Sequence, residues 1–159
     1  MKKPISIMGA GNWLISYDRI GPKVLELIQG RYGAEVELCE LGSTSLALLD
    51  HIHGQELMII IDACLQGNLP GTITVMAPDL NNRVVEMTSV HQIGPLETLA
   101  VANRLFQEKM PQKILLVMIE TNAINEKMEE SICQQVVKIL DQEISSWQRD
   151  HQKSIVHNP

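Results

Sequence analysis

The amino-acid sequence predicts an α/β fold: a single three-layer α/β/α domain with a mixed, mostly parallel five-stranded sheet. Residues 57–63 and 113–119 are almost wholly apolar, which is typical of central strands that are covered on both faces. Strand-like and helix-like segments follow one another in the order strand, helix, strand, helix, strand, strand, helix, strand, helix. This alternation favours one sheet with helices on both of its faces.

Local signals define the individual elements. The five expected strands lie at residues 4–8, 35–41, 57–63, 72–76 and 113–119. The four expected helices begin at Pro22, at Ser43 or Thr44, at Pro95 and at Glu126. The last of them continues to Trp147, because apolar residues recur at spacings of three or four up to that point. We therefore expect a domain over residues 1–147, followed by a frayed tail over residues 148–159 that lacks a periodic apolar face.

Composition excludes several classes of function. The 159 residues carry 13 Lys and Arg against 19 Asp and Glu, a formal net charge of -6, so we expect no nucleic acid partner. No stretch approaches the roughly 20 apolar residues that a membrane helix needs, so we expect no membrane insertion. The three cysteines form no C-x-x-C pair, which argues against a zinc knuckle or a thioredoxin-like site. Free thiols in apolar segments suit a cytoplasmic protein.

The glycine-rich loop after the first strand invites a dinucleotide-binding interpretation. That interpretation requires a third glycine where Leu14 stands, and a helix that starts directly on the turn rather than near Pro22. Glu40, at the end of the second strand, is well placed to bind a ribose, which leaves a small nucleotide-binding module as an alternative. A tight turn after the strand explains the glycines without any cofactor.

Three polar residues follow predicted strands or precede a predicted helix, where ligands gather in such sheets: Asp18, Asp62 and His91. Two carboxylates and one imidazole suit a divalent transition metal with open coordination positions. Each residue also has a structural interpretation. Asp62 could accept hydrogen bonds from loop amides, His91 could be a surface residue, and Asp18 could pair with Arg19 or favour a helix N-terminus. Neither a G-x-S-x-G elbow nor an H-E-x-x-H helix is present.

Three motifs in register resemble those of the hydrogenase maturation endopeptidases, over about residues 5–140. The family begins with a strand, then G-x-G-N-x-L, two acids and a second glycine pair, and residues 9–22 read GAGNWLISYDRIGP. The second acid, a metal ligand in the family, falls on Asp18. The family's strand-end aspartate falls on Asp62, with a Pro-Gly turn at residues 70–71 soon after it, and its histidine ligand falls on His91.

The resemblance implies an endopeptidase that removes the C-terminal extension of a nickel-iron hydrogenase large-subunit precursor after nickel insertion. Asp18, Asp62 and His91 would be its catalytic and metal-binding residues, and the precursor would supply the nickel. Tyr17 stands where the family has its first acid, and Arg19 stands where it has a glycine. An Arg19–Asp18 pair would compete with the metal. A catalytically inactive relative that acts as a docking chaperone for the precursor is the alternative.

Overall fold

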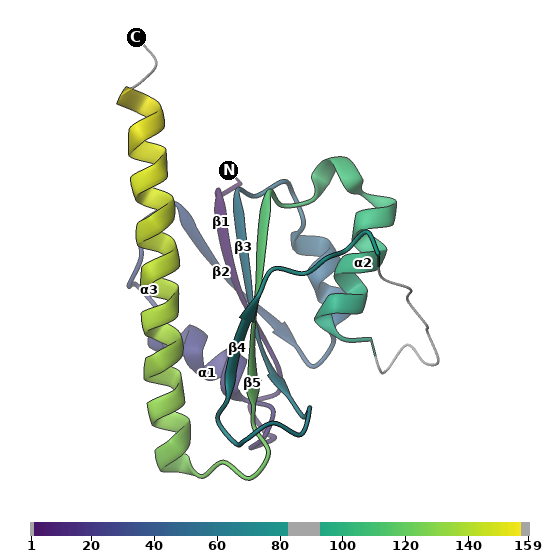
Figure 1. Ribbon diagram of the computed structural model, residues 1–159, viewed down its shortest axis with the longest axis vertical. Coiled ribbons are helices and arrows are strands. Elements are labelled where there is room, and N and C mark those ends of the chain that lie inside the picture. Colours follow the sequence, from purple (N-terminus) through teal and green to yellow (C-terminus); the bar gives the residue numbers. More distant parts are fainter. Residues whose placement is uncertain (1, 83–92, 157–159) are drawn as a thin grey trace.

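The computed structural model describes residues 2–82 and 93–156, and it confirms the predicted α/β fold with one mixed five-stranded sheet (Figure 1). The strands are β1 (Ile5–Ala10), β2 (Val36–Gly42), β3 (Leu57–Cys64), β4 (Ile73–Met76) and β5 (Lys113–Glu120). Their order across the sheet is β2-β1-β3-β5-β4, and all neighbours are parallel except β4 and β5. The two apolar strands that the sequence singled out, β3 and β5, therefore lie side by side in the interior of the sheet.

Helices cover the sheet on both faces, as expected. Helices α1 (Ile20–Leu27) and α3 (Glu126–Val156) pack on one face, and the 3₁₀ helix η1 (Ser45–His51) and α2 (Pro95–Leu105) pack on the other (Figure 1). A short 3₁₀ helix, η3 (Gln107–Lys109), links α2 to β5. Thr44 caps η1 by accepting a hydrogen bond from the Leu46 amide through its hydroxyl, at 3.3 Å. The predicted helix start at Pro95 is confirmed, whereas α1 begins two residues before Pro22.

Side chains along β3 alternate between the two faces, as the pleat of a strand requires. Ile59 and Ile61 lie in the core on the α1 and α3 side, whereas Met58 and Ile60 lie in the core on the η1 and α2 side. Asp62 is the next residue in the second series. Its carboxyl group is therefore directed to the face that α2 covers, at the carboxyl end of the strand.

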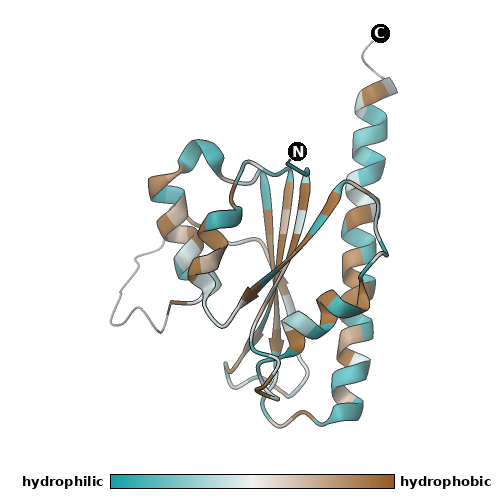
Figure 2. Ribbon diagram, turned by 180° about the vertical axis from the view of Figure 1, so that it is seen from behind, coloured by the Kyte–Doolittle hydropathy of each residue, from teal (hydrophilic) through white to brown (hydrophobic). Residues whose placement is uncertain are grey.

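Helix α3 is longer than predicted. It continues past the predicted end at Trp147 to Val156. Figure 2 shows the reason for the underestimate, because the last turns of this helix are mostly hydrophilic. Trp147 anchors this part: its indole Nε1 donates to Glu56 Oε2 at 2.9 Å, and its ring stacks on His151 at 4.6 Å. The division into a domain at 1–147 and a tail at 148–159 stays a prediction.

None of the helices within residues 2–82 and 93–156 combines the length and the hydropathy that a membrane-spanning segment requires.

Candidate active site at the carboxyl ends of β1 and β3

The sheet order creates a crevice at the carboxyl ends of β1 and β3. After β1 the chain passes through α1 to β2 on one side, and after β3 it passes through β4 and α2, on the opposite face, to β5 on the other side. Connections that leave neighbouring strands on opposite faces open a crevice between them, which is where doubly wound sheets bind ligands. Asp18 lies in the loop after β1, and Asp62 lies near the end of β3. The topology thus brings these two predicted site residues to one place.

The loop between β1 and α1 is folded tightly around the backbone of Asp18. The Asn12 amide donates to the Asp18 carbonyl at 2.8 Å, and the Asp18 amide donates to the Ile15 carbonyl at 2.9 Å. Gly11 has a φ of 131°, which L side chains rarely adopt, and a Cβ there would overlap the Asp18 carbonyl. The glycine of this turn is therefore needed to place Asp18, and no cofactor is required to explain it.

A second glycine lets α1 approach the sheet closely. A Cβ on Gly21 would lie 2.8 Å from the Ile61 carbonyl oxygen and closer still to that of Ala10. The start of α1 is thus in backbone contact with the ends of β1 and β3. A dinucleotide site needs its helix to start directly on the glycine turn, but α1 begins at Ile20, well after Gly11. The structure does not meet this requirement of the dinucleotide interpretation.

Asp62 has the most perturbed carboxyl group of the crevice. Burial, and to a smaller extent the charge of Asp18, raise the pKa of Asp62 from 3.8 to about 7, against a hydrogen bond from the Ala63 amide. Burial also raises the pKa of Asp18, against a backbone hydrogen bond from Asn12. Two carboxylates that repel each other in a partly desolvated place gain stability when they share a proton or a cation.

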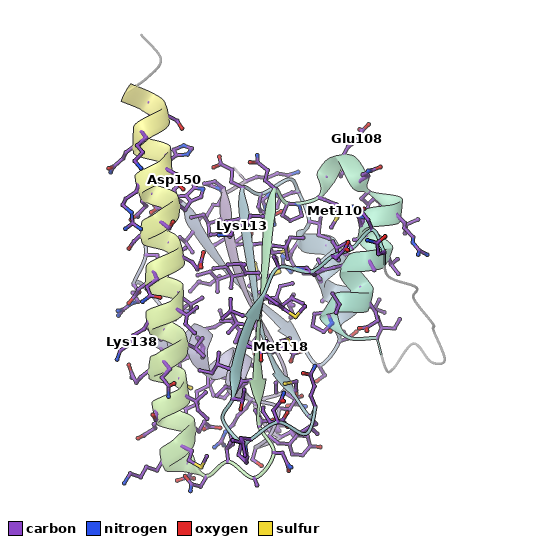
Figure 3. All side chains as sticks on the ribbon, in the orientation of Figure 1. Glu108, Met110, Lys113, Met118, Lys138 and Asp150 are labelled. Carbon is purple, nitrogen blue, oxygen red and sulfur yellow. The ribbon has the colours of Figure 1, made fainter. Side chains whose placement is uncertain are left out.

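A pocket of about 340 Å³ adjoins Asp62 on the α2 face of the sheet. Leu116 and Met118 of β5 form its floor, and the N-terminal turn of α2 forms a wall with Pro95 and Leu96. Met118, which Figure 3 labels on β5, is one of the residues that line this pocket. Asp62, Gln66 and Glu97 also line this pocket, and apolar walls beside a few polar groups are typical of sites that hold a peptide or small ligand.

Arg19 does not behave as the sequence suggested, because its guanidinium is directed to α3 rather than to Asp18. Arg19 Nε lies 3.2 Å from Glu129 Oε1 and 3.0 Å from Oε2, and Nη2 lies 3.0 Å from Oε1. Lys23 Nζ adds a contact of 2.6 Å to the same Oε1. The expected pair of Arg19 with Asp18 is therefore replaced by a pair with Glu129.

Sequence reasoning missed Glu129, although a signal for it was present. Glu129 is buried, and it lies three residues before Ile132 and seven before Val136, which belong to the apolar face of α3. An acid at such a position has to be paired. Burial raises the pKa of Glu129, but hydrogen bonds from Arg19 and Lys23 outweigh burial, so the net shift is downward and the group is ionised.

Two further residues shape the loops around the crevice. The Thr121 hydroxyl, at the end of β5, donates to the Tyr17 carbonyl at 2.6 Å, while the Tyr17 side chain is 55% exposed. Glu120 is buried, and its Oε2 accepts from the Gln66 amide at 2.8 Å and the Asn68 amide at 3.3 Å. Glu120 therefore organises the loop that follows Asp62.

The third predicted ligand, His91, lies outside the described residues. Within the described parts of the chain, no group of three or more His, Cys, Asp or Glu side chains could hold a metal ion. Asp18 and Asp62 supply two carboxylates, which suit a divalent cation only if a further donor completes the set. The described residues thus fit part of the predicted ligand set.

Comparisons with known proteins agree with the motifs. A family profile described as hydrogenase maturation protease matches residues 22–146, which include Asp62 and begin four residues after Asp18. The chain is 29% identical over 126 residues to the hydrogenase expression/formation protein HoxM of Azotobacter vinelandii, covering 77% of this chain and 60% of that protein. It is 28% identical over 121 residues to the hydrogenase 2 maturation protease of Escherichia coli, with 71% and 70% covered. The chain thus spans less than two thirds of HoxM.

Solved structures share the fold. The hydrogenase maturating endopeptidase HybD from E. coli superposes with a TM-score of 0.65 at 26% identity, covering 87% of this chain and 93% of the other. The hydrogenase maturation protease HycI from Thermococcus kodakarensis has the same fold, with a TM-score of 0.64 at 18% identity and coverage of 87% and 90%. The profile match extends over most of the domain. This chain belongs to the hydrogenase maturation protease family.

Proposed function

We propose that this protein is an endopeptidase that removes the C-terminal extension of a nickel-iron hydrogenase large-subunit precursor after nickel insertion. The observation that carries the proposal is the pair of carboxylates, Asp18 and Asp62, at the crevice of a chain from the maturation protease family. The precursor is its partner and substrate. A cytoplasmic location is part of the proposal, and the free thiols of Cys39, Cys64 and Cys133 support it.

Asp18, Asp62 and His91 are proposed as the residues that bind the nickel of the precursor and carry the reaction. The nickel belongs to the substrate, where it distinguishes a precursor that has received its metal and would polarise groups near the scissile bond. Mutual repulsion of Asp18 and Asp62 favours the cation, because its binding relieves the electrostatic cost of ionising both groups. A precursor without nickel would lack this attraction and would remain uncut.

Asp62 can change its protonation state near neutral pH before the precursor binds. A pKa of about 7 in the metal-free protein means that near neutrality the carboxyl group exists in both protonation states. Binding of the nickel would displace this proton and leave the ionised carboxylate available as a ligand. The pocket beside Asp62, walled by Leu116 and Met118, would hold a peptide segment next to this group.

The experiment is the intact mass of a nickel-loaded precursor from the same source, measured with and without the protein. We expect loss of a discrete C-terminal peptide with wild type, and no loss with Asp62→Ala or His91→Ala, although both variants should fold. Asp50→Asn is the control, because this exposed acid lies near the end of η1, which leads to the amino end of β3. Full processing by both site variants would refute the assignment.

The same experiment tests the docking chaperone. The exposed Tyr17 side chain, where the family has an acid, is the observation that favours this alternative. If the protein forms a stable complex with the loaded precursor and leaves its mass unchanged, the chaperone replaces the endopeptidase as the proposed function.

A further inference from the structure

The residue next to Asp18 carries a permanent positive charge, and the fold keeps that charge away from the crevice. We infer that Glu129 is a positioning residue of the site: by holding the Arg19 guanidinium against α3, it leaves the Asp18 carboxylate free to bind a cation. The inference rests on the proposed function for the identity of the cation, which is the nickel of the precursor.

The geometry around Glu129 supports this role. Its carboxylate accepts both Arg19 Nε and Nη2 within 3.2 Å, and it accepts Lys23 Nζ at 2.6 Å. The Glu129 side chain is 3% exposed, against 29% for Arg19 and 27% for Lys23. A forked contact from a guanidinium to a carboxylate is strong and directional. Arg19 is therefore held in one orientation by an acid that is itself fixed in the core.

Release of Arg19 would place its charge near a pair of carboxylates. Arg19 directly follows Asp18, and its long side chain can turn back towards the crevice, where the charge of Asp18 raises the pKa of Asp62. A guanidinium there would compete with the metal. Glu126, one turn earlier on α3, also attracts Arg19, but it is exposed, so solvent screens its effect. Glu129 is therefore the residue that keeps the Arg19 guanidinium away from the crevice.

A purely structural role, in which the pair only joins α1 to α3, predicts different results. Arg31 and Asp141 provide a matched control, because Arg31 Nε and Nη2 contact the two Asp141 oxygens at 2.8 and 2.7 Å in a second fork between these parts of the chain. This second fork lies beyond the end of α1, in the turn that follows it. Asp141→Asn removes a pair of the same geometry, although a more exposed one, without releasing a charge beside Asp18.

The test is an NMR titration of the full chain with Ni²⁺ alone, which broadens the amide signals of residues near a bound ion. Glu129→Gln should require about tenfold more Ni²⁺ than wild type for the same broadening at Asp18 and Asp62. This is the change expected if the released guanidinium weakens cation binding by as much as it would lower a neighbouring carboxyl pKa, about one unit. The double variant Arg19→Ala/Glu129→Gln should return to within about twofold of wild type. Arg19→Ala and Asp141→Asn should bind as wild type does.

Restored Ni²⁺ binding in the double variant supports the inference. If the Arg19–Glu129 pair only joined α1 to α3, removal of Arg19 as well could not restore what the loss of Glu129 had removed. Equal loss in Glu129→Gln and the double variant overturns it, as does a wild type whose signals Ni²⁺ leaves unchanged. If Glu129→Gln fails to fold, Arg19→Ala decides, because weaker binding by this variant would show that Arg19 serves the site directly. Precursor processing is a separate readout: an uncut precursor with wild type ends the proposed function, whereas the Ni²⁺ titration still decides the role of Glu129.

Discussion

Replacement of Asp62 by asparagine is expected to stabilise the protein at pH 8 while abolishing the proposed processing of the precursor. The folded-state pKa of Asp62 is raised from 3.8 to about 7, so between these two values the folded state binds a proton that the unfolded state has lost. Stability therefore falls as pH rises from about 4 to about 7 and stays low above that. The shift corresponds to about 4 kcal/mol at most, since one pKa unit is about 1.4 kcal/mol.

Partial exposure of Asp62 reduces this figure, so we expect Asp62→Asn to gain about 2 to 4 kcal/mol at pH 8 and nothing at pH 4. For a chain of this size the gain corresponds to a Tm increase of about 4 to 16 °C. The assay is urea unfolding at both pH values, followed by circular dichroism. Asp18→Asn should show a smaller gain, because Asp18 is less buried than Asp62 and its charge contributes less than burial to the raised pKa of Asp62.

The exposed Asp50, at the end of η1, provides the control, and Asp50→Asn should show no such dependence on pH. An equal gain for Asp62→Asn at pH 4 and pH 8, or no gain at pH 8, would refute the reasoning from burial and charge.

Three further changes test other parts of the structure. Gly11→Ala should lower the free energy of unfolding by at least about 2 kcal/mol and abolish most precursor processing, because the new Cβ would overlap the Asp18 carbonyl. Gly30 is also at positive φ but has no atom within 4 Å of an added Cβ, so Gly30→Ala should lower the free energy of unfolding by only about 1 kcal/mol and retain processing. Glu120→Ala should cost about 2 to 3 kcal/mol and speed hydrogen exchange at the Gln66 and Asn68 amides, and unchanged exchange would contradict its role. Truncation after Trp147 should cost about 1 kcal/mol or less by thermal unfolding, because the described side chains beyond it are largely exposed; unfolding of the truncated chain would show that the tail belongs to the domain.

The parts of the fold that follow from local pattern were predictable. Apolar runs identified β3 and β5, and their position in the interior of the sheet follows from burial on both faces. Asp62 was predicted as a site residue because a partly buried carboxylate at the end of an apolar strand needs hydrogen-bond donors or a metal. The strand order and the antiparallel direction of β4 were not predictable, because both depend on pairing between segments that are distant along the chain.

The misjudged features involve charges whose partners are far apart in sequence. A pair of Arg19 with its neighbour Asp18 was one possibility, but the buried Glu129, more than 100 residues away, accepts the guanidinium instead. The predicted last helix also ended too early, at Trp147, because the apolar periodicity stops there. The last turns of α3 are stabilised by helix propagation and by contacts to Glu56 rather than by an apolar face. The site residue His91 remains a prediction, as does the role of all three site residues.

The position of β5 between β3 and β4 has a consequence for synthesis on the ribosome. β4 pairs only with β5 in the described sheet, and β3 has one edge that β5 alone covers. Until residues 113–120 have emerged, a nascent chain exposes the isoleucine-rich edge of β3 and cannot form β4. The Asp62 pocket also lacks its Leu116 and Met118 wall at that stage. Fragments that end before β5 should therefore aggregate, and the site should form only when nearly the whole domain has been made.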